Sequence, residues 1–183
     1  GGEAPPVPWE EVRDQAAPAA KAPGPAFRDA HAALAFASAG DETSFSRMVA
    51  GLENLASKRN ALAREVTLPL VRGIRAFANG LYDEAVEEME PAVAQLTRIG
   101  GSHAQREVFE DTLLEAYLRA GRFDRAEKVL RARLSLRTSV RDMYWLGRAQ
   151  ANTGQAQPAA VSFSEAAKGW QNADLESDEM VAL

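Results

Sequence analysis

The sequence predicts an all-α protein in which helical hairpins stack into a solenoid. Apolar side chains recur at helical spacing through most of the chain. The second half also repeats at a step of 33 residues, which pairs Leu113 with Leu146, Gly121 with Gly154, and Ala126 with Ala159. Steps of this length are typical of helical repeats, in which each hairpin buries its apolar face against the next. We therefore expect a chain of hairpins that share one continuous core.

Composition limits the classes of function. The 183 residues are 46% hydrophobic and 26% charged, which is ordinary for one folded domain. The net charge of -5 and the pI near 5.2 argue against general attraction to nucleic acid phosphates. The chain has no cysteine, no apolar run long enough to span a membrane and no signal-peptide pattern, so we expect a cytoplasmic protein. Because it begins Gly1-Gly2 and ends within a helical pattern, we expect a fragment of a longer protein.

Residues 1–25 are predicted to be a Pro/Ala-rich arm or linker. Six of the nine prolines lie there, and prolines remove backbone donors and favour extended structure. One or two helical turns are expected after Pro8, with Trp9 docked on the body of the protein.

The first two hairpins are predicted over residues 26–97. Gly40 and Gly80 mark their turns, and Asp41 is placed to cap the helix that follows Gly40. Pro69 lies inside the helical pattern of residues 60–79 and should bend or split it near Thr67. Pro91 is expected to cause a second kink.

The following connection and the chain end also carry local signals. Ser102 with Gln105 fits a capping box at the start of the next helix. Residues 171–183 form an acidic segment with apolar residues near its end, which fits a truncated capping helix of a solenoid.

Small residues in the last hairpin predict close contact between its two helices. Gly147 on the first helix is expected to accept Ala159 on the second, with Leu146 and Phe163 filling the space beside them. Gly121 and Gly154 fall where the first helix of each pair must end, and a left-handed residue ends a helix there at least cost.

The spacing of these residues resembles the tetratricopeptide repeat. The last unit has the family's order of Leu146-Gly147, Gly154, Ala159, Phe163 and Ala166. The preceding unit matches at Leu113, Tyr117, Gly121, Phe123, Ala126 and Leu130, but has Leu114 where the family prefers Gly and Arg133 where it prefers Ala. The stretch from Arg98 to Arg106, followed by an acid, Val and Phe, is similar to bacterial members of the tetratricopeptide-repeat protein 38 family. The resemblance covers about Phe27 to Trp170. It implies a right-handed superhelix of about four hairpins over residues 26–170.

The same resemblance implies that the first helix of each hairpin lines a concave groove that binds a protein or peptide. The residues placed there are Leu70, Ile74, Phe77, Asp111, Glu115, Arg141, Tyr144, Arg148 and Asn152. The alternative is that Leu70, Ile74 and Phe77 belong to the core. The Lys-and-Asn clamp of chaperone-binding members is missing at the matching positions, so a chaperone adaptor is disfavoured.

A second candidate site is His103 with Gln105 and Arg106. His103, Glu107 and Asp111 follow a spacing of four along one helix face, which could hold a metal or relay a proton; the alternative is that His103 only lies in the first turn of a helix. No catalytic, metal or phosphate-loop signature is present, and no cofactor is expected.

Three functions remain open from the sequence. The first is a scaffold that binds an unidentified protein or peptide, with no catalysis of its own, no nucleic acid and no membrane. The second is part of a larger enzyme or small-molecule-binding protein with its site near His103. The third is a self-assembly module whose groove takes the acidic C-terminal segment of another copy.

Overall fold

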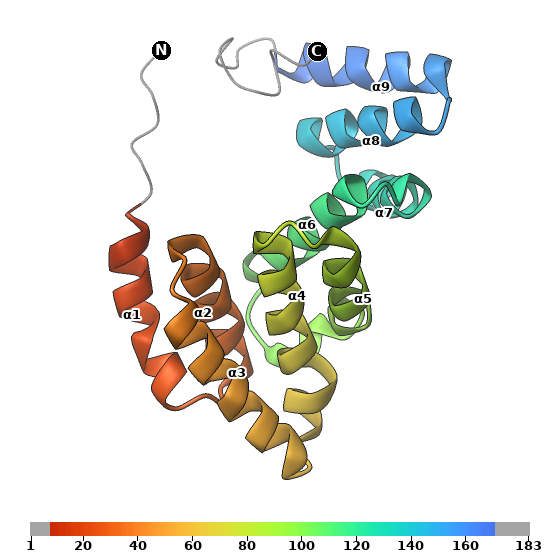
Figure 1. Cartoon of the computed structure of the whole chain (residues 1–183). Helices are drawn as coiled ribbons and strands as arrows, with labels where there is room; N and C mark the ends of the chain where they lie inside the picture. Colours follow the sequence, from red (N-terminus) through yellow and green to blue (C-terminus); the bar gives the residue numbers. More distant parts are fainter. Residues whose placement is uncertain (1–7, 171–183) are drawn as a thin grey trace. The chain divides into compact units, whose positions relative to one another are not determined.

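The computed structural model describes residues 8–170, and this part of the chain is all-α, as the sequence predicts (Figure 1). Its elements are α1 (Trp9–Lys21), α2 (Ala26–Ala39), α3 (Glu42–Ser57), α4 (Leu68–Ala78), α5 (Tyr82–Val93), α6 (His103–Arg119), α7 (Phe123–Leu136), α8 (Val140–Asn152) and α9 (Ala156–Gly169). A π-helical turn, Ala63–Thr67, precedes α4, and a 3-10 turn, Leu96–Ile99, follows α5. Among the described residues, no helix combines the length and apolar character needed to cross a bilayer. The acidic segment 171–183, with its expected capping helix, lies outside the described residues.

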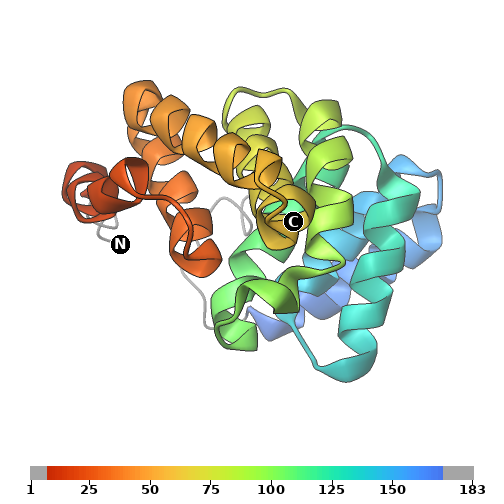
Figure 2. The ribbon, with the colours of Figure 1, turned by 90° about the horizontal axis from the view of Figure 1, so that it is seen from below.

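The chain divides into two compact units, with the boundary inside α6 between Ala116 and Tyr117. In the first unit, α1, α2 and α3 lie side by side, and α4 packs along α5 (Figures 1 and 2). In the second unit, α8 lies between α7 and α9 and contacts both.

Four helix pairs share one kind of turn. Gly40, Gly80, Gly121 and Gly154 have φ angles of +66°, +75°, +70° and +78°. The residue after each glycine donates its N–H to a carbonyl five residues back, as Asp41 does to Phe36 at 2.9 Å and Gln155 to Gln150 at 2.9 Å. This is the pattern of a helix end closed by a left-handed residue, for which glycine has no steric penalty. The turns expected at Gly121 and Gly154 are confirmed.

The N-terminal segment differs from the expected extended arm. Residues 9–21 form α1, which begins after Pro8 and contains Pro18. Ala19 and Ala20 in its last turn are buried, so apolar packing compensates for the hydrogen bond that Pro18 cannot make. Trp9, expected to dock on the body of the protein, is 40% exposed. Residues 1–7 lie outside the described part of the chain.

The helical stretch before α4 is split where the sequence predicts. Pro69 lies in the first turn of α4, directly after the π-helical turn that ends at Thr67. Pro69 has no N–H for the carbonyl of Glu65, so the normal helical ladder is interrupted there. The Leu68 N–H instead bonds to the Ala63 carbonyl, one residue further back than in an α-helix.

Two hairpins are held together by the same combination of a small and a large residue. A Cβ added to Gly73 in α4 would lie 2.2 Å from Met89 Cγ in α5, and one added to Gly147 in α8 would lie 2.7 Å from Phe163 Cδ1 in α9. Each glycine stands seven residues before the turn glycine of its hairpin, and each partner nine residues after it. The atoms nearest to Gly147 therefore belong to Phe163, and Ala159, the expected neighbour of Gly147, is also buried.

A buried acid in α2 should make stability depend on pH. Asp29 has no exposed surface and accepts hydrogen bonds from the Gly24 N–H and from Arg28 Nη2, the latter at 2.9 Å. Burial raises the pKa of Asp29 above its ordinary value, and the bonds from Gly24 and Arg28 offset only part of this. The folded state therefore holds this proton more tightly than the unfolded chain does.

We expect the Asp29 contribution to the free energy of unfolding to decrease as pH rises from about 4, the ordinary pKa of Asp, through the raised pKa of Asp29. Urea unfolding at a series of pH values should show that Asp29→Asn lacks this contribution. Groups with a lowered pKa, such as Asp41, make stability change with pH in the opposite direction. They are present in both proteins, so the difference between the two stability profiles reports on Asp29 alone. Parallel stability profiles for the two proteins would contradict this expectation.

Candidate functional site

The groove residues expected on α4 lie mostly in the core. Leu70 and Ile74 are buried, whereas Phe77 is half-buried with its ring 5.6 Å from that of Tyr82. The reason is that α4 packs against α2, α3 and α5, so more than one of its faces is covered. Leu70 and Ile74 therefore follow the alternative interpretation and do not line a surface groove.

The expected groove residues on the other first helices are divided between surface and core. Asp111 and Glu115 are half-buried, one turn apart on α6. On α8, Tyr144 is buried, and its ring lies 5.8 Å from Phe163 and 5.6 Å from Trp170, so it belongs to the contact between α8 and α9.

The remaining α8 residues stay at the surface. The guanidinium of Arg141 lies 4.8 Å above the ring of Trp145, which is a cation–π contact. Arg148 is half-buried, and Asn152 donates a hydrogen bond to its carbonyl oxygen at 2.8 Å. These residues form a polar and aromatic edge of α8.

The alternative site at His103 has the geometry of a helix start. His103 is exposed as the first residue of α6. The Ser102 N–H donates to Gln105 Oε1 at 2.8 Å, and the Gln105 N–H donates to Ser102 Oγ at 3.3 Å, which confirms the expected capping box. Arg106 donates to the carbonyls of Gly100 and Gly101. No group of three potential metal ligands occurs among residues 8–170. This arrangement favours the alternative in which His103 only lies in the first turn of a helix.

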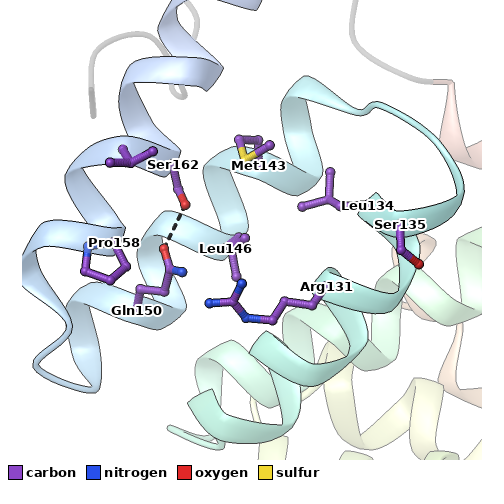
Figure 3. Close-up of a pocket in the computed structure, with 9 residues that line it drawn as sticks. Arg131, Leu134, Ser135, Met143, Leu146, Gln150, Pro158 and Ser162 are labelled. Carbon is purple, nitrogen blue, oxygen red and sulfur yellow. Dashed lines mark hydrogen bonds between the residues drawn. The ribbon is translucent and has the colours of Figure 1, made fainter.

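An open pocket in the second unit was not expected from the sequence. It has a volume of about 490 Å³ and lies where α7, α8 and α9 meet (Figure 3). Its walls are Arg131, Leu134 and Ser135 from α7, Met143, Leu146 and Gln150 from α8, and Pro158, Val161 and Ser162 from α9. Most of this lining is apolar. Val161 is 60% exposed at the pocket, and Leu136, next to the lining residue Ser135, is 88% exposed.

The pocket contains a buried pair of polar side chains, Gln150 and Ser162, which are 2% and 5% exposed. The Gln150 amide lies 2.8 Å from Ser162 Oγ, the bond drawn in Figure 3. With the amide oriented to satisfy all its neighbours, its nitrogen also donates to the Pro158 carbonyl at 3.1 Å, and its oxygen accepts from Arg131 Nη2 at 3.0 Å. This network fixes the Arg131 side chain beside the apolar walls.

Glu127 holds Arg131 from the other side. Arg131 Nε donates to Glu127 Oε1 at 2.8 Å, and Gln155 donates to Glu127 Oε2 at 2.8 Å. Burial alone would raise the pKa of Glu127, but the bonds from Arg131 and Gln155 outweigh it and the pKa is lowered. Glu127 therefore stays ionised and keeps the guanidinium in place.

The step of 33 residues contained a signal for this pocket. It pairs Tyr117 with Gln150 and Val129 with Ser162, so the last hairpin has smaller or polar side chains where the preceding one has larger apolar ones. A buried polar side chain needs hydrogen-bond partners, and Gln150 finds them in Ser162, Pro158 and Arg131 at the pocket. The sequence does not show that Gln150 is buried, because glutamine is mostly found at protein surfaces.

Neither a family model nor a solved structure significantly matches this chain. The resemblance to the tetratricopeptide repeat therefore stays a prediction that rests on the residues named above.

Proposed function

We propose that this chain is a tetratricopeptide-type interaction module that binds a peptide segment of another protein and has no catalytic activity of its own. The observation that carries the proposal is the open apolar pocket between α7, α8 and α9. Its volume of about 490 Å³ falls in the range of pockets that enclose ligand groups, and its apolar walls suit one or two large side chains of a peptide.

The proposed architecture is a right-handed superhelix of about four hairpins. Two features support it. The four turns close with left-handed glycines in one hydrogen-bond pattern, and Gly73 and Gly147 occupy equivalent positions against large side chains. Such repetition is typical of solenoids, whose units bind ligands along a shared surface.

Val161 offers a direct test of the pocket. Peptides selected from a displayed library on the purified protein should bind Val161→Asn at least about tenfold more weakly than the original chain, because a polar amide replaces an apolar contact at the pocket. Isothermal titration calorimetry measures the dissociation constants.

Ala160→Asn is the matched control, since Ala160 is exposed on the same helix and does not line the pocket. It should bind the selected peptides as the original chain does. Equal affinities for the two variants would show that the pocket is not where peptides bind.

A further inference from the structure

Over residues 6–170, the two compact units carry opposite formal charges. Residues 6–116 contain eleven Lys and Arg against seventeen Asp and Glu, a net charge of -6. Residues 117–170 contain ten Lys and Arg against four Asp and Glu, a net charge of +6. The remaining charge of -5 comes from Glu3 and four acids of residues 171–183, which belong to the second unit and bring its net charge to +1. The pocket lies among the basic residues 117–170. Such a field attracts acidic ligands and speeds their association.

The basic charge reaches the pocket itself. Arg131 lines it, and Lys128 is exposed one turn earlier on α7, where residues three apart are neighbours on a helix surface. Arg131 is held in place by Glu127 and Gln150 through its Nε and Nη2 groups. Its guanidinium has five N–H donors, so Nη1 can donate to an incoming carboxylate without breaking those bonds.

The lining distinguishes a peptide from a nucleic acid. Single-stranded nucleic acids are held by basic grooves in which bases stack on aromatic rings. The lining of this pocket consists of Leu, Met, Val, Pro, Ser, Gln and Arg side chains, which offer no ring for stacking. An aliphatic side chain fits walls such as Met143, Leu146 and Val161 better.

We infer that the pocket binds an acidic peptide segment of a partner protein, which inserts a large apolar side chain between α8 and α9 and directs its carboxylates to Lys128 and Arg131. The inference rests on the proposed peptide-binding function and specifies the chemistry of the ligand. The apolar side chain supplies the buried contact, and the carboxylates select among peptides and accelerate their binding.

Three labelled twelve-residue peptides test this by fluorescence anisotropy with the full chain. The first carries four glutamates and two leucines, the second has glutamine in place of each glutamate, and the third has serine in place of each leucine. We expect the first to bind about tenfold more tightly than the second, since two or more charge-assisted contacts are lost, and the third to bind least. The advantage of the first peptide should shrink at about 1 M salt, where the Debye length is only about 3 Å.

Lys128→Glu locates the charge effect. It should weaken binding of the glutamate peptide about fivefold, the scale of one or two exposed charge contacts, and leave the glutamine peptide unchanged. Lys58→Glu changes the net charge equally but lies in the acidic unit, so it should leave both affinities unchanged. Circular dichroism confirms that each variant is folded.

Each contrary result has a distinct meaning. If the glutamine peptide binds as tightly as the glutamate peptide and Val161→Asn weakens both, acidic selection is overturned while the peptide-binding function stands. If none of the three peptides binds and library selection also yields none, both are overturned. If a twelve-nucleotide single strand binds more tightly than any peptide and Lys128→Glu abolishes this, the ligand is a nucleic acid. If light scattering shows self-association that Lys128→Glu abolishes, the acidic partner is a second copy.

Discussion

Gly73→Val is expected to lower the free energy of unfolding by about 3 kcal/mol, because it forces a side chain into a closed contact between two helices. A Cβ at this position would lie 2.2 Å from Met89 Cγ, 3.3 Å from Met89 Cβ and 3.2 Å from the carbonyl oxygen of Ala85. The Ala85 oxygen is a backbone atom, and Met89 Cβ is bonded directly to the backbone of α5. Neither atom can therefore move away by a side-chain rotation. The helices α4 and α5 must therefore move apart. Valine gains only a few tenths of a kcal/mol over glycine in helix propensity, which does not offset the overlap.

Urea unfolding followed by circular dichroism measures this loss. Ala78→Val is the matched control, because it places the same side chain at an exposed position of the same helix and should change stability by less than about 0.5 kcal/mol. Met89→Ala should recover part of the loss when combined with Gly73→Val, since it removes the atoms that overlap. Losses of similar size at positions 73 and 78 would mean that α4 and α5 are not in close contact at Gly73.

The local features of the fold could be predicted because their causes are local. The left-handed turns at Gly40 and Gly121, the capping box at Ser102 and the interruption before Pro69 each depend on a few neighbouring residues. Their hydrogen bonds are made within one turn of chain, so the sequence contains the whole cause.

The candidate site could be predicted only in part, because burial depends on what surrounds a helix. Leu70 and Ile74 have the apolar character of a groove and equally that of a core, and the contacts of α4 with three other helices place them in the core. The prolines near Ala19 and Ala20 favour extended structure. Burial of these two alanines outweighs that preference, so α1 continues through them. The pocket depends on Gln150, whose amide is buried through partners on two other helices.

Arg133 and Asp142 bring opposite charges together between α7 and α8. Arg133 stands where the tetratricopeptide repeat prefers alanine, and it corresponds to the buried Ala166 in the last hairpin. Arg133 Nη1 lies 3.7 Å from Asp142 Oδ1, and Arg141 Nε lies 4.0 Å from the same atom. Asp142 is fully buried, and neither carboxylate oxygen has a hydrogen-bond partner within the described part of the chain. These two arginines therefore face the Asp142 carboxyl group, and Arg133 is the more buried of the two.

Arg133→Met should consequently lower the free energy of unfolding by about 3 kcal/mol, since it leaves a buried carboxylate with less compensation. Asp142→Leu in the same chain should recover most of this loss, because replacing both members of a buried ion pair with apolar side chains of similar size is often neutral. Urea unfolding of the two single variants and the double variant gives the coupling free energy directly. Strictly additive effects would mean that the two side chains do not interact. A large coupling would instead show that Arg133 and Asp142 join α7 to α8 as one pair.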